Sequence, residues 1–128
     1  MKRLLLIEDN PDNLKLVEML LSPLRIRLDT ASDGPAGLAA ARAQAYDLIL
    51  LDIQLPGMDG HAVARALREI PGAATTPTVA VTSHAMAGDR ERALLDGFTE
   101  YLEKPLDPTT FADTIGALLA LGEDSRIR

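Results

Sequence analysis

Apolar runs with the length of β-strands alternate along this sequence with longer segments that have helical periodicity. Strands are predicted at residues 3–7, 26–31, 47–51, 78–82 and 99–102. Strands that alternate with helices in this way predict repeated βα units around a parallel sheet. The predicted fold class is therefore α/β, with a doubly wound sheet of five parallel strands and helices on both of its faces.

The pattern also predicts the order of the strands. An interior parallel strand is covered on both faces and is continuously apolar, as are the runs at 3–7, 47–51 and 78–82. The other two runs carry polar residues, namely Arg25, Arg27 and Asp29 at the second strand and Glu100 and Glu103 at the fifth. These two strands are expected at the edges, which gives the order 2-1-3-4-5. In that order ligands bind beyond the carboxyl ends of the first and third strands.

The first and last helices have clear start signals. Pro11 suits the first turn of a helix, and the apolar residues of this first helix form one stripe: Leu14, Val17, Leu20 and Leu21. The pair Asp107 and Pro108 marks the start of the last helix, whose apolar residues are Phe111, Ile115 and Leu118. Helices are also predicted within 34–45, 60–70 and 87–97. We expect one domain over 1–121, a flexible C-terminal tail at 122–128 and no output domain.

Composition narrows the class of protein. The chain has 128 residues, 47% of them hydrophobic and 25% charged, which is typical of a globular domain with a single core. The net charge of −6 argues against binding to nucleic acid or to an anionic membrane surface. Cysteine is absent, so disulfides and thiolate metal sites are excluded, and no apolar run approaches the length of a membrane span. A cytoplasmic protein is expected.

Charged and hydroxyl side chains follow the ends of the predicted strands. Glu8 and Asp9 come directly after the first strand, Asp52 after the third and Lys104 after the fifth, while Thr82 ends the fourth. Because the carboxyl ends of parallel strands meet at one edge of a sheet, these five residues are expected to share one site. Asp52 alone would be an ordinary surface or capping aspartate, and it is this convergence that indicates a functional role.

Three carboxylates in one site repel each other. At about 4 Å and an effective dielectric constant near 20, each pair of like charges costs on the order of 4 kcal/mol. A proton, the amine of Lys104 or a divalent cation could offset this repulsion, and an all-oxygen donor set favours Mg²⁺ over Zn²⁺. Such a site could neutralise a phosphoryl group while a carboxylate oxygen of Asp52 attacks its phosphorus. Asp52 would then become an acyl phosphate.

Four short motifs carry a resemblance to a known family: "ED" at 8–9, "LDIQLPGMDG" around Asp52, "VTSHA" from Val81 and "EKP" from Glu103. With these motifs, nearly the whole chain resembles the receiver domain of response regulators in two-component phosphotransfer signalling. The resemblance implies a flavodoxin-like (βα)5 fold. It also implies that Asp52 accepts a phosphoryl group from a phosphohistidine on a histidine kinase or a histidine phosphotransfer protein.

The resemblance implies roles for further residues. Mg²⁺ would be held by Glu8, Asp9, Asp52 and the backbone carbonyl of Gln54, and Thr82 and Lys104 would contact the phosphoryl oxygens. The Lys104–Pro105 peptide bond would be cis. Phosphorylation would draw Thr82 inward and let Tyr101 turn toward the vacated space, which changes a protein-binding face. Positions that tune the phosphoryl lifetime in this family are occupied here by Gln54, Ser83 and His84.

Several residues have simpler interpretations. Asp9 or Asn10 could cap the first helix, and Asp59 is expected to cap the helix that follows the "PGMDG" turn. His61 and His84 are expected to be exposed to solvent, because two isolated histidines make a poor zinc site. Met19 lies off the apolar stripe of the first helix and is expected at the surface.

The leading functional hypothesis is a single-domain response regulator that acts by binding a downstream protein, as a monomer or weak dimer, without a separate substrate. A receiver domain cut from a hybrid histidine kinase is an alternative. Another is a Mg²⁺-dependent phosphatase with an aspartyl-phosphate intermediate, although such enzymes carry a second acid two residues after the nucleophile, where this chain has Gln54. An interaction module with a vestigial site is the third alternative.

Overall fold

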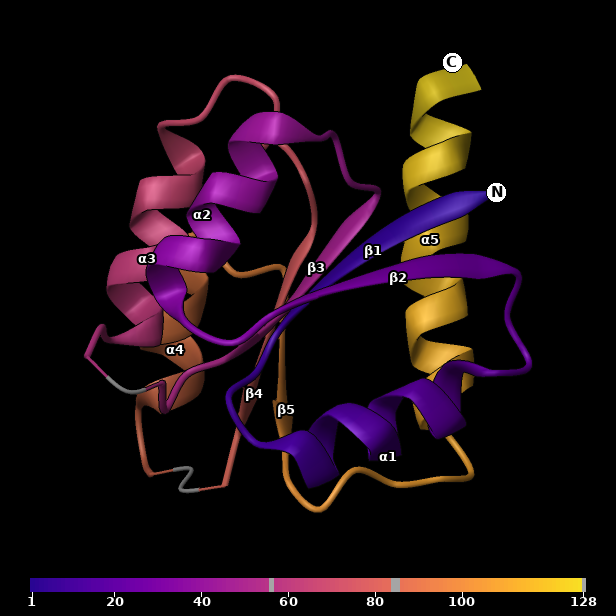
Figure 1. Cartoon of the computed structure of the whole chain (residues 1–128), viewed down its shortest axis with the longest axis horizontal. Helices are drawn as coiled ribbons and strands as arrows, with labels where there is room; N and C mark the ends of the chain where they lie inside the picture. The colour runs from indigo at the N-terminus through magenta and orange to yellow at the C-terminus, as the bar shows by residue number, and fades with distance from the viewer. Residues whose placement is uncertain (56, 84–85, 128) are drawn as a thin grey trace.

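The computed structural model describes residues 1–55, 57–83 and 86–127, with the last seven of these as backbone only. Its five strands are β1 (Lys2–Ile7), β2 (Ile26–Ala31), β3 (Leu48–Asp52), β4 (Thr78–Thr82) and β5 (Glu100–Glu103). They form one parallel sheet in the order β2-β1-β3-β4-β5 (Figure 1). The predicted fold class and strand order are confirmed, and the two strands with polar residues are the edges.

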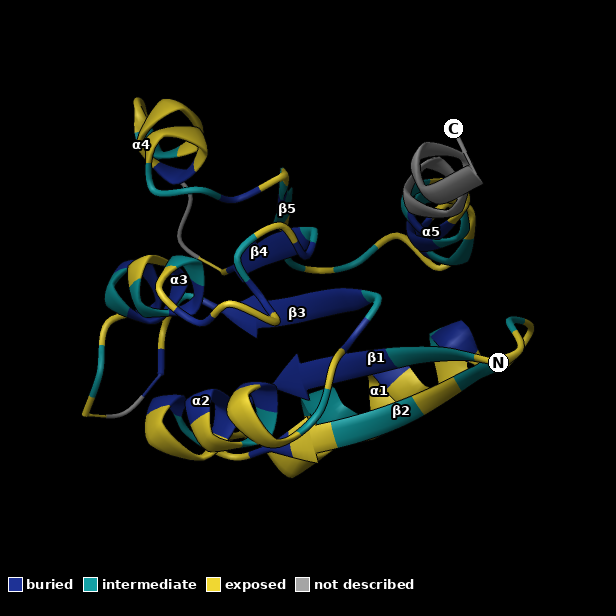
Figure 2. Cartoon of the chain, turned by 90° about the horizontal axis from the view of Figure 1, so that it is seen from above, coloured by how far each residue is buried: buried dark blue, intermediate teal, exposed yellow. Residues whose placement is uncertain are grey.

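The helices form one layer on each face of the sheet. They are α1 (Pro11–Leu21), α2 (Gly34–Ala43), α3 (Gly60–Arg68), α4 (Asp89–Leu95) and α5 (Phe111–Ile127). Helices α1 and α5 cover one face, and α2, α3 and α4 cover the other (Figure 2). The sheet is therefore the middle of three layers, and its interior strands are buried on both sides, as their continuous apolar sequences predict.

The core consists of two apolar clusters separated by the sheet. Successive strand side chains point to opposite faces, so Leu4 and Leu6 of β1 join one cluster, and Leu5 and Ile7 join the other. The first cluster includes residues from α1 and α5: Val17, Leu21, Phe111, Ile115 and Leu119. The second includes residues from α2 and α3: Leu38, Ala41, Val63, Ala64 and Leu67. The predicted stripe of α1 is confirmed, while Leu119 was missing from the stripe predicted for α5.

The helix starts are fixed by side-chain caps. Asn10, rather than Asp9, caps α1, because its Oδ1 accepts from the backbone N–H groups of Asp12 and Asn13 at 2.8 and 3.3 Å. Asp59 caps α3 as predicted, with its Oδ1 3.1 Å from the amide nitrogen of His61. With Asn10 used as the cap, the carboxylate of Asp9 is left for another role.

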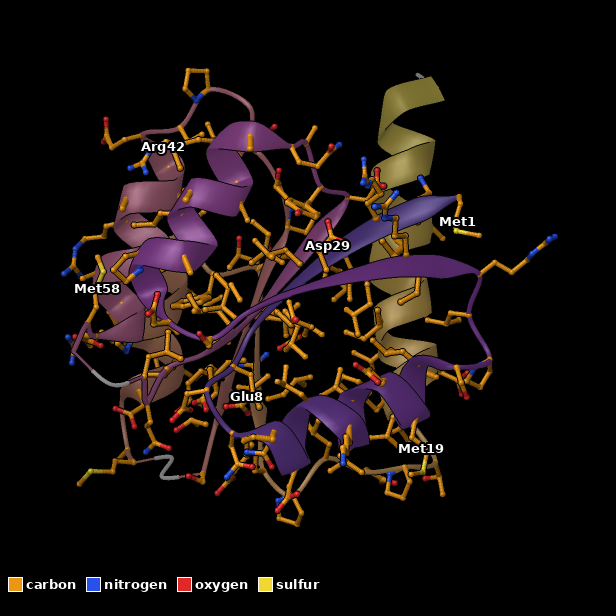
Figure 3. The ribbon with its side chains drawn as sticks, in the orientation of Figure 1. Met1, Glu8, Met19, Asp29, Arg42 and Met58 are labelled. Atoms are coloured by element: carbon orange, nitrogen blue, oxygen red, sulfur yellow. The ribbon has the colours of Figure 1, made fainter. Side chains whose placement is uncertain are left out.

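Two further expectations are tested by burial. Met19 is 69% exposed, as predicted, and lies on the side of α1 that faces away from the sheet (Figure 3). The prediction for His61 is wrong: it is only 5% exposed, because its ring packs edge-on against Phe98 and contacts Asp96. His84 lies outside the described residues.

The C-terminal segment 122–128 lies largely within α5. The backbone of this helix continues to Ile127, so most of the segment 122–128 is helical, and its flexibility stays a prediction. Among the described residues, none of the helices combines the length and the hydrophobicity that a membrane span requires.

Candidate functional site

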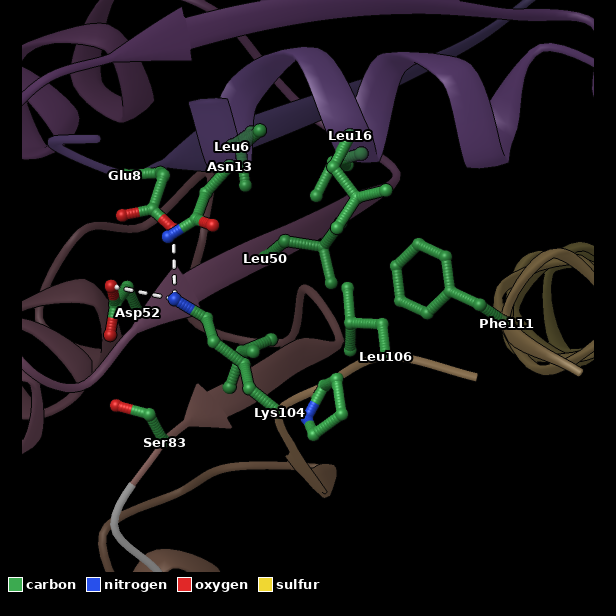
Figure 4. Close-up of a pocket in the computed structure, with 13 residues that line it drawn as sticks. Leu6, Glu8, Asn13, Leu16, Leu50, Asp52, Ser83, Lys104, Leu106 and Phe111 are labelled. Carbon is green, nitrogen blue, oxygen red and sulfur yellow. Dashed lines mark hydrogen bonds and ion pairs between the residues drawn. The ribbon is translucent and has the colours of Figure 1, made fainter. Parts of the chain in front are cut away.

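The predicted site residues lie together at the carboxyl-terminal edge of the sheet. Glu8 directly follows β1, Asp52 ends β3, Thr82 ends β4 and Lys104 directly follows β5. The strand register pairs Asp52 with Val81 and Thr82 with Glu103, which aligns the ends of the last three strands. The convergence expected from the sequence is therefore present in the structure (Figure 4).

Asp52 is held through both of its carboxylate oxygens. Lys104 Nζ donates to Oδ2 at 3.2 Å, and the backbone N–H of Gln54 donates to Oδ1 at 2.9 Å. The same ammonium group donates to Oε1 of Glu8 at 3.0 Å (Figure 4). Asp52 is 6% exposed and Glu8 is 3% exposed, so Lys104 bridges two carboxylates that are almost removed from solvent. These contacts fix the orientation of the Asp52 carboxylate.

A third carboxylate makes the charge of this site unbalanced. One oxygen from each of Glu8, Asp9 and Asp52 lies within 4.8 Å of the others. We call these three acids, together with Lys104, the mouth cluster. Burial, and then the nearby Asp52, raise the pKa of Glu8, even though Lys104 opposes this shift. Burial lowers the pKa of Lys104, but its contacts with Glu8 and Asp52 outweigh this effect and raise the pKa overall.

The mouth cluster fits a hard divalent cation. Its donors are all carboxylate oxygens, they converge within 4.8 Å, and one ammonium group does not balance three carboxylates. Asp9 is exposed, so this side of the cluster is open to solvent, whereas Glu8 and Asp52 are buried. Mg²⁺ suits such a site, because it binds through few carboxylates and retains several waters.

A cavity of about 310 Å³ adjoins the mouth cluster. Its polar end is formed by Glu8, Asp52, Ser83 and Lys104, and the rest is mainly apolar, lined by Leu16, Leu50, Leu106 and Phe111, among others (Figure 4). The amide of Asn13 also points into this space, and sequence reasoning missed this residue (Figure 4). Its place three positions after Asn10, one helical turn into α1, was the available signal.

The proposed switch residues are both buried. Thr82 is 2% exposed, and its backbone carbonyl accepts from the N–H of Lys104 at 2.7 Å. Tyr101 is 9% exposed, forms a hydrogen bond with the Thr82 side chain, and has its hydroxyl 3.5 Å from Oδ2 of Asp89. Burial and the Asp89 carboxylate raise the pKa of Tyr101. The tyrosine ring in this structure therefore lies inward and connects β4 with the start of α4.

Gln54 contacts Asp52 through its backbone N–H, and Ser83 lines the adjoining cavity. The hydroxyl of Ser83 donates to Oε1 of Gln54 at 2.6 Å, and both residues are exposed. The Lys104–Pro105 peptide bond has the cis geometry that the family resemblance implies.

A second charged cluster was not predicted. His61 Nδ1 lies 2.7 Å from Oδ2 of Asp96, and Arg65 donates to Oδ1 of Asp96 at 3.3 Å. Arg92 approaches the same carboxylate at 3.9 Å. We call these four residues the junction cluster, because they join α3 to the end of α4. Although burial alone raises the pKa of Asp96, the hydrogen bonds from His61 and Arg65 outweigh it and lower the pKa.

Comparison with known proteins defines the family. The sequence model of the response regulator receiver domain family matches residues 4–116 of this chain. The chain therefore belongs to this family of two-component signalling domains. The structure is similar to the receiver domain of the sensor histidine kinase PA1611 from Pseudomonas aeruginosa PAO1, with 34% identity and a TM-score of 0.84. That match covers 93% of this chain and 98% of the other, which has a magnesium ion in its active site cleft.

Two similar curated proteins are much longer than the segment that matches this chain. The chain is 40% identical over 101 residues to the signal transduction histidine-protein kinase BarA of Escherichia coli (strain K12), and 39% identical over 105 residues to the response regulator PleD of Caulobacter vibrioides. These matches cover 79% and 82% of this chain but only 11% of BarA and 23% of PleD. The chain therefore corresponds to one domain of these relatives.

Proposed function

We propose that this receiver domain accepts a phosphoryl group on Asp52 from the phosphohistidine of a histidine kinase or a histidine phosphotransfer protein. The main support is the geometry of the mouth cluster, in which Lys104 and the N–H of Gln54 orient the Asp52 carboxylate at the end of the central strand. Burial of an ionised carboxylate is costly, and the hydrogen bonds from Lys104 and Gln54 offset this cost for Asp52. A carboxylate held in this way at the edge of the sheet is placed to act as a nucleophile.

In the proposed reaction, an electron pair on a carboxylate oxygen of Asp52 forms a bond to phosphorus. The phosphorus–nitrogen bond of the phosphohistidine breaks, its electron pair stays on the imidazole, and that nitrogen takes up a proton. Lys104 lies 3.2 Å from Asp52 and would hold its ammonium group against the phosphoryl oxygens. Thr82 ends the adjacent strand and would contribute its hydroxyl on the other flank.

Glu8, Asp9, Asp52 and the backbone carbonyl of Gln54 would hold Mg²⁺. When bound, this ion supplies positive charge to the phosphoryl group during the transfer. The 34% identical PA1611 receiver domain has a magnesium ion in its active site cleft, which supports the proposal that the acidic cluster of this chain holds Mg²⁺. No separate substrate is proposed, since the phosphoryl group is received by the domain itself.

The proposed output is altered binding to a downstream protein. Thr82 contacts Tyr101, and Tyr101 contacts Asp89 at the start of α4, so a movement of Thr82 toward a phosphoryl group has a direct path to α4. A ligand or modification shifts such an equilibrium only through different interactions with the two states. In the unphosphorylated state Thr82 makes a hydrogen bond to Tyr101, and in the phosphorylated state it would make one to the phosphoryl group instead.

The test is phosphorylation by a small acyl phosphate with Mg²⁺, followed by intact-mass measurement. We expect uptake of one phosphoryl group, which is absent in Asp52→Asn. Asp33→Asn is the matched control, because Asp33 caps α2 through its Oδ1 and asparagine caps equally well. Uptake that persists in Asp52→Asn would contradict the proposed acceptor.

A further inference from the structure

The outer edge of β2 has backbone groups that the sheet does not use. Among the described strands β1 is its one neighbour, and β2 lies at the rim of the sheet (Figure 2). The carbonyl of Ala31 accepts from the N–H of Glu8, which directly follows β1, so the polar backbone groups of Ala31 face β1. Because these groups alternate in direction along a strand, those of Leu28 and Thr30 face outward. An edge of this kind is a template for pairing with another strand.

The side chains on one face of this edge carry charges of both signs. Arg27 is exposed, and its Nε lies 3.6 Å from Oδ1 of Asp29, two residues along the same face of the strand. The hydroxyl of Tyr46 donates to Oδ2 of Asp29 at 2.7 Å, which fixes this carboxylate and leaves Oδ1 directed at Arg27. The edge therefore presents one positive and one negative side chain in fixed order.

This order of charges makes the edge complementary to itself. In two antiparallel β2 strands centred on Leu28, position 27 of one copy lies opposite position 29 of the other, so each Arg27 faces an Asp29. A pair centred on Arg27 or on Asp29 would place like charges opposite each other instead. Charge therefore selects a single register, and it also selects against parallel pairing in register.

The backbone favours the same register. The outward N–H and carbonyl groups of Leu28 would bond to those of Leu28 in the second copy. The N–H of Thr30 would bond to the outward carbonyl of Ile26, whose own N–H already donates to Leu24. On the other face of the strand, Ile26 and Leu28 are half-buried and line a cavity of about 190 Å³ with Leu21 and Leu24. Pairing would cover this apolar surface.

We propose that the outer edge of β2 is a self-association surface, through which two copies of this domain pair antiparallel about Leu28. The two sheets become one continuous sheet, with the Arg27 and Asp29 side chains paired across the junction. The mouth cluster takes no part in this contact, so the association does not depend on phosphorylation of Asp52.

Sedimentation equilibrium of the full chain over a range of concentrations tests the proposal, and a reversible monomer–dimer equilibrium is expected. Arg27→Glu places a carboxylate opposite Asp29, and Asp29→Arg places a guanidinium group opposite Arg27. Each variant alone should therefore dimerise at least about tenfold more weakly. An equimolar mixture of the two variants should regain the dimer, because each reversed side chain then meets its opposite charge. A variant that simply failed to fold would not be rescued by mixing.

Arg90→Glu is the matched control for net charge. Arg90 lies on α4 and pairs with Glu100 of β5, at the opposite edge of the sheet, so its reversal should leave the dimer unchanged. A wild-type chain that stays monomeric at every concentration would overturn the proposal. So would a dimer that Arg90→Glu weakens and Arg27→Glu does not, or a mixture of folded variants that stays monomeric.

Amide hydrogen exchange locates the contact residue by residue. The N–H groups of Arg27 and Asp29 face β1 and should be protected at all concentrations. Those of Leu28 and Thr30 face outward and should become protected only as the dimer forms. If exchange at Leu28 and Thr30 stays unchanged where sedimentation shows a dimer, the contact lies elsewhere and the proposal is wrong.

Discussion

The mouth cluster and the junction cluster use similar side chains in opposite ways. In the mouth cluster, three carboxylates face one ammonium group. In the junction cluster, the single carboxylate of Asp96 is surrounded by His61, Arg65 and Arg92. Both clusters contain buried ionisable groups. Arg92 also lies 3.8 Å from Asp59, so two arginines face two carboxylates at the junction cluster, whereas the mouth cluster has an excess of carboxylates.

The difference is visible in the pKa values. Excess negative charge and burial raise the pKa of Glu8 in the mouth cluster, whereas its partners lower the pKa of Asp96 in the junction cluster. We expect a cluster with excess negative charge to be completed by a cation from outside the chain. A balanced cluster is complete by itself, and its effect is to hold two helices together. Charge balance thus separates the cluster with a proposed function from the structural one.

The largest expected effect is on removal of the ammonium group from the mouth cluster. Lys104→Met leaves Glu8 and Asp52 buried without their shared cation, so the free energy of unfolding should fall by about 3 kcal/mol in buffer without Mg²⁺. Urea unfolding measures this change. Asp52→Asn removes one of the like charges instead, so the free energy of unfolding should rise. Equal losses in the two variants would mean that the mouth cluster is a balanced structural cluster as well.

Removal of the carboxylate from the junction cluster should have the next largest effect. Asp96→Ala leaves the buried Nδ1 of His61 without its partner, so a loss of about 1–3 kcal/mol in unfolding free energy is expected. Asp113→Ala on the exposed side of α5 is the control for loss of a charge. Phosphate uptake should be the same in both variants and in wild type. A loss of uptake in Asp96→Ala would break the distinction between the two clusters.

Mg²⁺ should stabilise the domain through the mouth cluster. At a concentration about ten times its dissociation constant, a ligand of the folded state adds about 1.4 kcal/mol to the unfolding free energy. Asp9→Asn removes one of the three converging carboxylates and should reduce this increment, while Asp33→Asn should retain it. Thermal unfolding with Mg²⁺ and with a chelator measures the increment. An undiminished increment in Asp9→Asn would place the ion elsewhere.

The smallest expected effects are on how stability depends on pH, and they should have opposite signs for Glu8 and Asp96. The folded pKa of Glu8 lies above its ordinary value of 4.5, so its contribution to stability is greatest at low pH and falls as the pH rises through the window above 4.5. The folded pKa of Asp96 lies below its ordinary value of 3.8. Its contribution is complete above 3.8 and is lost as the pH falls through the folded pKa.

These signs can be measured by urea unfolding between about pH 3 and pH 7 in buffer without Mg²⁺. The stability of wild type relative to Glu8→Gln should decrease as the pH rises above 4.5. The stability of wild type relative to Asp96→Asn should decrease as the pH falls below 3.8. Slopes of the same sign in both comparisons would contradict the assignment of opposite charge balance.

Sequence reasoning predicted the strands and the mouth cluster for a simple physical reason. Interior parallel strands are marked by continuous apolar runs, and whatever follows each strand must lie at the same edge of the sheet. Asp52 and Lys104 are 52 residues apart in sequence, yet each is placed by its own strand. Contacts that depend on strand ends are therefore accessible from local patterns.

The junction cluster depends instead on how two helices approach each other. His61, Arg65 and Arg68 lie at helical spacing on one side of α3, and they contact the carboxylate of Asp96 or the carbonyl of Gly97. A stripe of three basic side chains on α3, together with an acid at the end of the next helix, was the available signal. The exposure of His61 was predicted because isolated histidines make a poor zinc site, an argument that does not test burial in an apolar contact. The packing of Phe98 against its ring could not be read from the sequence.

The small apolar contribution of α4 has a consequence for movement. Ala93 is its buried residue, Leu94 and Leu95 are 48% and 89% exposed, and the ends of the helix are held by Arg90 on Glu100 and by Asp96 on His61. Tilting this helix would expose the methyl group of Ala93 and part of Leu94, and it would exchange a few polar contacts for water. Each such exchange changes the free energy by only about 0.5–1.5 kcal/mol. The proposed modification of a single carboxylate would therefore supply enough free energy to reposition this helix, with Ala93 leaving the edge of its apolar cluster while the rest of the core stays packed.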